Sequence, residues 1–92
     1  MSERKHKKTL EAIFAHPIKT NIDWKDIEHL FEYLGFEVSL TKKHHAKIKA
    51  EDGSEVVVIL PHHGHAIESK DEIVKIRHFL EAKGVTPDTF AA

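Results

Sequence analysis

The chain has 92 residues, of which 40% are hydrophobic and 32% are charged, and its formal net charge is −1 at pH 7 with neutral histidine. These values predict one small globular domain and exclude a disordered chain or a globally basic nucleic-acid-binding protein. Cysteine is absent, which excludes disulfides and thiolate metal sites, whereas histidine is unusually frequent and occurs nine times. No apolar run reaches the roughly 20 residues of a membrane helix, and no apolar signal-peptide core follows the polar N-terminus, so we expect a cytoplasmic protein.

Two amphipathic helices are predicted in the first third of the chain. The first spans about residues 4–15 and ends before Pro17, because the residue preceding a proline disfavours the helical region. The second spans about residues 24–34, where apolar residues recur at three- and four-residue spacing. Asp23 is the expected N-cap of this helix, and Gly35 stands where a left-handed residue closes it.

Three strands are predicted next, at about residues 36–41, 45–50 and 55–60. The first two alternate apolar and polar residues, which is the pattern of a half-buried strand. The pair Asp52-Gly53 predicts a hairpin between the second and third strands. The third strand is a continuous apolar run, which is typical of a strand that is central in its sheet or covered on both faces.

The last helix is predicted at about residues 70–82, opened by a capping box formed by Ser69 and Glu72. This helix and the helix at 24–34 must bury their apolar stripes on the same face of a three-stranded antiparallel sheet. The fold class is therefore α+β, with one sheet face left open unless the helix at 4–15 covers it, which the sequence does not decide. We divide the chain into an N-terminal helix and loop, a core, and a frayed tail, at residues 1–22, 23–85 and 86–92.

The middle strand carries a row of cationic and imidazole side chains. Period-two spacing places His45, Lys47 and Lys49 on one face, and Lys42 and Lys43 precede them. Lysines can neutralise phosphates, and an imidazole can move the proton of a ribose 2′-hydroxyl, so this row is a candidate site for RNA cleavage without a metal. The alternative is a solvated strand face that only keeps the sheet soluble.

Two further clusters of histidine or basic residues are weaker candidates for a functional site. His62, His63 and His65 follow the third strand at a spacing that can chelate zinc, but the nearby acidic residues are better explained as helix-start residues, so we expect no functional metal site. Without a metal this loop can lie beside His45 or contact RNA. The basic run at residues 4–8 is either a solvated helix start or an interaction segment.

The order of these features resembles the HicA (YcfA-like) family of bacterial toxins, over about residues 24–84. The segments that carry the resemblance are Leu34-Gly35-Phe36, Lys43-His44-His45, Asp52-Gly53 and Leu60-Pro61-His62-His63. They correspond to the family's helix-ending Gly-Phe, its Gly-Ser-His at the second strand, its Asp-Gly hairpin and its Val-Pro-x-His at the end of the third strand. Lys43-His44 replaces the family's Gly-Ser, which adds bulk and charge where a glycine permits close approach.

The resemblance implies a double-stranded-RNA-binding-like α-β-β-β-α core with an extra N-terminal helix. It implies a metal-independent mRNA endoribonuclease (mRNA interferase) with no cofactor, neutralised by a HicB-type antitoxin, in which His45 is catalytic. The RNA-binding candidates that accompany it are Lys42, Lys43, Lys47, Lys49 and His63. The alternative is a module of the same fold that binds RNA or protein without cleaving.

Overall fold

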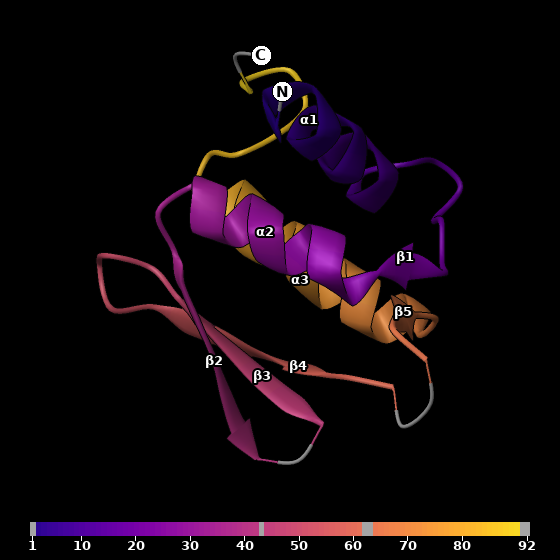
Figure 1. The fold of residues 1–92 in the computed structure, drawn as a ribbon. Coiled ribbons are helices and arrows are strands. Elements are labelled where there is room, and N and C mark those ends of the chain that lie inside the picture. The colour runs from indigo at the N-terminus through magenta and orange to yellow at the C-terminus, as the bar shows by residue number, and fades with distance from the viewer. Residues whose placement is uncertain (1, 43, 62–63, 91–92) are drawn as a thin grey trace.

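The computed structural model describes residues 2–42, 44–61 and 64–90 (Figure 1). The elements in chain order are α1 (Ser2–Ile13), β1 (Ile22–Asp23), α2 (Trp24–Tyr33), β2 (Glu37–Lys42), β3 (His45–Lys49), β4 (Glu55–Ile59), β5 (Ala66–Ile67) and α3 (Lys70–Ala82). Three helices and a three-stranded antiparallel sheet confirm the α+β class. Within the described ranges, no helix is long and apolar enough to cross a membrane.

Helix α2 begins and ends where the sequence predicts. The Asp23 side chain accepts a hydrogen bond from the Lys25 N–H at 2.9 Å, which makes Asp23 the N-cap. Gly35 has a φ of 91°, and the Phe36 N–H donates to the Phe31 carbonyl at 2.9 Å. The rings of Phe31 and Phe36 are 5.4 Å apart, which completes a Schellman closure with its hydrophobic contact. This closure turns the chain directly from α2 into the sheet.

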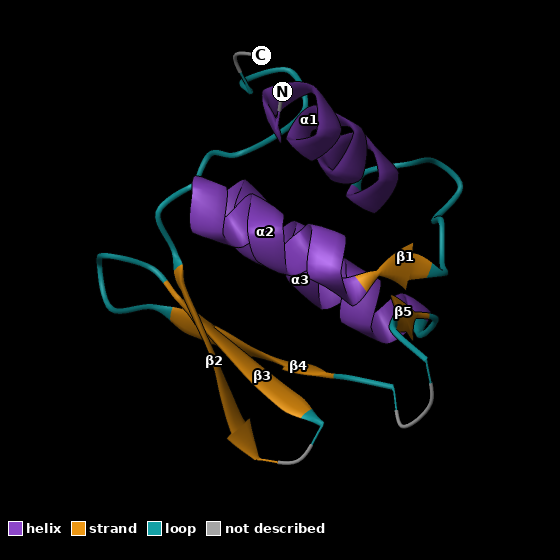
Figure 2. Cartoon of the chain, viewed as in Figure 1, coloured by secondary structure: helices purple, strands orange, loops and turns teal. Residues whose placement is uncertain are grey.

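The main sheet has the strand order β2-β3-β4, with both pairs antiparallel, and α2 and α3 cover one of its faces (Figure 2). On this covered face Ala46, Ile48 and Val58 are fully buried in the core. β4 is an edge strand, so the expectation that it is central or covered on both faces is wrong. Val57 and Ile59 point to the other face, where 40% and 48% of their surfaces are exposed.

Side chains of α3 protect the outer edge of β4. The Ile59 N–H donates to Glu72 Oε1 at 2.9 Å, and Lys75 Nζ donates to the Val57 carbonyl at 2.8 Å. Glu72 and Lys75 are themselves ion-paired at 2.9 Å. Ser69 occupies the N-cap position of α3 but makes no side-chain cap hydrogen bond. The predicted capping box is therefore wrong, because Glu72 serves the sheet edge instead of the helix start.

Helix α1 forms a third layer, on the side of α2 and α3 that faces away from the sheet (Figure 1). Leu10 and Ile13 are fully buried there. Arg77 of α3 closes the C-terminal end of α1, where its Nε donates to the Ile13 carbonyl at 3.2 Å and its Nη2 to the Ala15 carbonyl at 3.0 Å. The guanidinium also lies over the Phe14 ring, 5.8 Å from its centroid. The N-terminal helix thus leaves the second face of the sheet uncovered.

A small second sheet, which the sequence did not reveal, joins two loops. β1 and β5 pair antiparallel, with Ile22 opposite Ile67 and Asp23 opposite Ala66. The Asn21 N–H adds a bond to the Ile67 carbonyl at 2.8 Å. Two-residue strands are too short to show an alternating pattern, so only the tertiary structure reveals them. The pairing fixes the start of α2 beside the start of α3.

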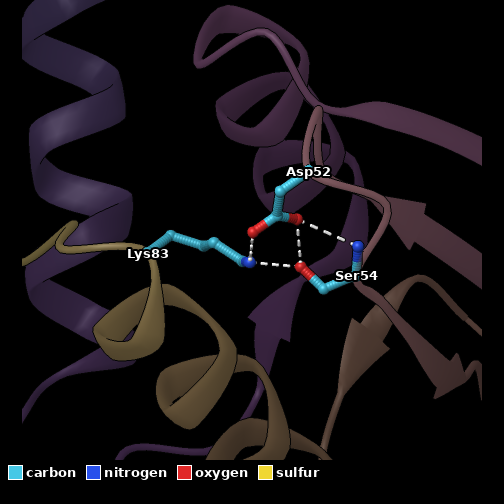
Figure 3. A network of polar contacts seen from close by, with 3 residues as sticks. All are labelled: Asp52, Ser54 and Lys83. Carbon is cyan, nitrogen blue, oxygen red and sulfur yellow. Dashed lines mark hydrogen bonds and ion pairs between the residues drawn. The ribbon is translucent and has the colours of Figure 1, made fainter.

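The β3–β4 hairpin is tied to the end of α3 by a polar network (Figure 3). Lys83 Nζ lies 2.6 Å from Asp52 Oδ2 and also donates to Ser54 Oγ. The Ser54 N–H donates to Asp52 Oδ1 at 2.9 Å, and Gly53 has a φ of 92°, as the Asp-Gly turn requires. Hydrogen bonds from Lys83 and Ser54 hold the pKa of Asp52 well below its ordinary value. The turn is therefore fixed to the helix layer.

Candidate functional site

The uncovered face of the main sheet, here called the outer face, carries every described residue of the predicted RNA site. The strand register places nine side chains on it: Glu37, Ser39 and Lys42 from β2, His45, Lys47 and Lys49 from β3, and Glu55, Val57 and Ile59 from β4. β3 is the central strand, so its three polar side chains form the middle row. The sequence predicted this row from the alternation of β3 alone, and the register adds its neighbours on both sides.

His45 lies at one end of the middle row. It is half-buried, and its register partners are Lys42 on β2 and Ile59 on β4. The register therefore places a lysine side chain on one side of His45 and an aliphatic side chain on the other. Lys47 follows on the same face, two residues along β3. An imidazole between cations and an apolar wall is suited to proton transfer beside a bound phosphate.

Charge on the outer face changes along β3. Lys47 Nζ is 3.9 Å from Glu55 Oε2, and 34% of its side chain is exposed. Lys49 lies at the other end of the row, where its register partners are Glu37 on one side and Glu55 on the other. These carboxylates offset the charge of Lys49. Because Glu55 is also the ion-pair partner of Lys47, the end that holds His45 and Lys42 is the part of the row with no carboxylate in register.

The turn that leads into His45 has a constrained backbone. β2 ends at Lys42, β3 begins at His45, and these two residues are register partners. His44 has a φ of 66°, a left-handed conformation that L-residues other than glycine adopt at a cost. Its carbonyl accepts the Leu60 N–H at 2.7 Å, which ties the turn to the end of β4. The start of β3, and with it His45, is thus fixed from both sides.

The remaining predicted site residues are not all described by the structure. Lys43, His62 and His63 lie outside the described residues. His65 is exposed, and its carbonyl accepts the Trp24 N–H at 2.6 Å, so its backbone anchors the start of α2. Over residues 2–42, 44–61 and 64–90, no group of three or more histidine, cysteine, aspartate or glutamate side chains is arranged to hold a metal ion.

Sequence reasoning missed the apolar part of the outer face. Val57 and Ile59 of the edge strand β4 are exposed beside the middle row. The sequence signal for this apolar surface is the continuous apolar run of β4. Such a strand is apolar on both faces, so it exposes apolar side chains when one face of the sheet is uncovered. A continuous apolar run predicts burial on both faces only if the strand is central, and the sequence does not give the strand order. The outer face therefore combines cations with aliphatic surface.

Comparison with known proteins identifies no relative of this chain. No protein-family model, no curated protein and no solved structure matches the chain. The HicA resemblance accordingly rests on the sequence motifs alone. Any functional conclusion must be carried by the residues of the outer face.

Proposed function

We propose that the chain is a HicA-like RNA-binding protein that cleaves mRNA without a metal, with His45 as its catalytic base. The observation that carries this proposal is the placement of His45 opposite Lys42 and beside Lys47 on the one sheet face that no helix covers. A strand of RNA needs an accessible cationic surface, and its own 2′-hydroxyl supplies the nucleophile.

The proposed reaction uses only the imidazole, the lysines and the RNA. His45 removes the proton of a ribose 2′-hydroxyl, and the 2′-oxygen attacks the adjacent phosphorus. The bond from phosphorus to the 5′-oxygen of the next nucleotide breaks, and that oxygen takes a proton from solvent or from the imidazolium. Lys42 and Lys47 stabilise the charge that develops on the phosphoryl oxygens. The products are a 2′,3′-cyclic phosphate and a 5′-hydroxyl end.

The exposed aliphatic side chains support RNA as the occupant of this face. Val57 and Ile59 lie beside Lys47 and His45 respectively in the strand register. Ribose rings and base faces can pack on such apolar surface while phosphates pair with the lysines. We assign Lys42, Lys47 and Lys49 to phosphate contacts, and the proposal extends to Lys43 and His63 from the sequence. Apart from the two-residue strand β5 before α3, the order α2-β2-β3-β4-α3 is also that of a double-stranded-RNA-binding-like core.

The second candidate is a module that binds without cleaving. Two observations favour it: Lys43-His44 replaces the family's Gly-Ser, and His44 has a left-handed backbone although it is not glycine. A face with both lysines and exposed Val57 and Ile59 could equally hold an acidic protein, such as a HicB-type antitoxin. In that case RNA and antitoxin would compete for the same surface.

RNA cleavage in EDTA tests the first candidate. The wild-type protein should degrade a single-stranded RNA in the presence of EDTA, and His45→Ala should lower the rate by about 10²–10⁴-fold, the range for loss of a general base. His78→Ala, which removes an exposed histidine of α3, is the matched control and should retain full activity. A single-stranded DNA of the same sequence should resist cleavage, because it lacks the 2′-hydroxyl. An inert wild type, or activity that EDTA removes, would contradict this mechanism.

Salt-dependent binding tests the second candidate. A fluorescent single-stranded RNA should bind with an affinity that falls steeply with salt, and Lys47→Ala should reduce the slope of log K against log salt by about 1. Lys25→Ala, at an exposed lysine of α2, should leave the slope unchanged. Binding of this kind without cleavage selects the binding module. Stoichiometric zinc in the purified protein would instead favour the histidine cluster at His62, His63 and His65.

A further inference from the structure

A second histidine site lies at the other end of the molecule, where α1 packs on α2. His6 of α1 is only 7% exposed. Its imidazole lies against the Tyr33 ring of α2, with 4.6 Å between the ring centroids and 34° between the planes. The contact lines a pocket of about 620 Å³ between the two helices, together with Thr9 and the exposed His29. The site belongs to the layer that faces away from the sheet (Figure 1).

The C-terminal tail also contacts Tyr33. Phe90 lies 6.0 Å from the Tyr33 ring, and it is held there by a turn in which its N–H donates to the Thr86 carbonyl at 3.0 Å. Thr89 Oγ1 donates to the Gly84 carbonyl at 2.9 Å. His6, Tyr33 and Phe90 therefore join three segments that are distant in the sequence. A change at His6 is expected to act on α1 and on this tail together.

Burial of His6, and to a smaller extent its charged neighbours, disfavour its protonation. Lys5 precedes it on α1, and Asp26, His29 and Glu32 face the pocket from α2. Asp26 could stabilise an imidazolium, but it is paired with Lys5 at 3.3 Å. Burial, then His29 and Lys5, lower the pKa of His6 from its ordinary value, while Asp26 opposes them.

We propose that the contact of His6 with Tyr33 is an acid-sensitive latch, which holds the N-terminal half of α1 on α2 at neutral pH and weakens on mild acidification. A neutral imidazole can stay stacked and buried, whereas an imidazolium must regain water or a carboxylate partner. Because the docked state lowers the pKa of His6, the docking stability is complete above the unfolded value of about 6.5 and declines as the pH falls through the folded value. Release would detach from α2 the segment that carries the exposed Arg4, Lys5 and Lys8 and the half-buried Lys7.

The core below α1 has its own supports, so the proposal predicts a local change. The sheet packs on α2 and α3 from the opposite side, and Arg77 holds the C-terminal end of α1 at the Ile13 carbonyl. The latch also lies across the helix layer from the outer face (Figure 1). It is therefore independent of RNA binding, and loss of RNA cleavage would leave it unaffected.

Hydrogen exchange tests the latch residue by residue. Between pH 7.5 and 5.5, protection factors of amides in the first two turns of α1 should fall severalfold, while those of β3 stay constant. His6→Gln should remove this pH dependence, and His29→Gln should reduce it. His78→Gln, at an exposed histidine of α3, should leave it unchanged. A fall in β3 that matches the fall in α1, or an unaltered pH dependence in His6→Gln, would overturn the proposal.

A titration of the wild-type protein provides a second measurement in case His6→Gln fails to dock α1. The ring protons of His6, followed by NMR, should titrate with a midpoint below that of an unstructured histidine. The signals of Tyr33 and Phe90 should shift with the same midpoint, because both rings belong to the same contact. A His6 midpoint above the ordinary value, or aromatic signals that do not follow it, would refute the latch.

Discussion

Lys47 and Ile48 are neighbours on β3 but lie on opposite faces of the sheet, and they differ in burial and in the chemistry of the side chains around them. Ile48 is fully buried beneath α2 and α3, whereas Lys47 is half-buried on the outer face and makes one ion pair at 3.9 Å. The covered face is occupied by tightly packed apolar side chains, and the outer face mixes lysines, a histidine and exposed aliphatic residues. Stability should therefore depend on the parts of the sheet that the helix layer contacts. Chemistry should depend on the parts that it does not contact.

The largest stability effect should come from the covered face itself. Ile48→Ala should reduce the free energy of unfolding by about 3 kcal/mol, because it removes buried methyl groups and leaves a cavity in a packed core. Lys47→Ala, one residue away, should change it by less than about 0.5 kcal/mol, since an exposed ion pair contributes little. Urea unfolding followed by Trp24 fluorescence measures both. An equal loss of unfolding free energy in the two variants would contradict the expected difference between the two faces.

The next effect should come from the β4 edge, where α3 reaches around the sheet. Glu72→Ala should reduce the free energy of unfolding by about 2 kcal/mol, because it removes a charged acceptor from the Ile59 N–H and the partner of Lys75. Glu72→Gln should lose less, since its amide oxygen can still accept that bond. Glu68→Ala, at an exposed position, is the control. A Gln variant as unstable as the Ala variant would argue against the hydrogen bond as the cause.

A smaller, pH-dependent effect should come from the hairpin that Lys83 ties to α3. Because its hydrogen bonds lower the pKa of Asp52, the contact stabilises the fold above the unfolded value of about 3.9 and is lost as the pH falls through the folded value. Asp52→Asn should therefore be less stable than the wild type at pH 7, and the difference should shrink toward pH 2.5. Asp88→Asn, in the exposed tail turn, should show no such convergence.

The smallest effect on stability should come from His44, which directly precedes β3. His44→Gly should raise the free energy of unfolding by about 0.5 kcal/mol, because glycine relieves a left-handed conformation but loses more entropy on folding. His44→Ala should not stabilise, since alanine meets the same backbone restriction. Thermal melts of the three proteins would measure the difference. A stabilised Ala variant would show that the side chain of His44, and not its backbone, determines the effect.

The local elements were largely predictable because their signals are local. The apolar stripe of α2, its N-cap Asp23 and its closing residue Gly35 follow from spacing and from single-residue chemistry, and the structure confirms each. Strand alternation likewise placed His45 and Lys47 on one face. Predictions that required a partner distant in the sequence were less reliable. The spacing of Ser69 and Glu72 predicts a capping box, whereas Glu72 accepts its hydrogen bond from the N–H of Ile59, 13 residues earlier in the chain.

What the sequence determined by itself was the three helices and the three strands of the main sheet, their order and the shared face of the β3 lysines and histidine, since periodicity and capping act within a few residues. Only the tertiary structure decided the strand order, which makes β4 an edge and exposes Val57 and Ile59. It also decided that α1 packs behind α2 and α3 and leaves the outer face open. These outcomes depend on which apolar surfaces bury one another, and that is a property of the whole chain.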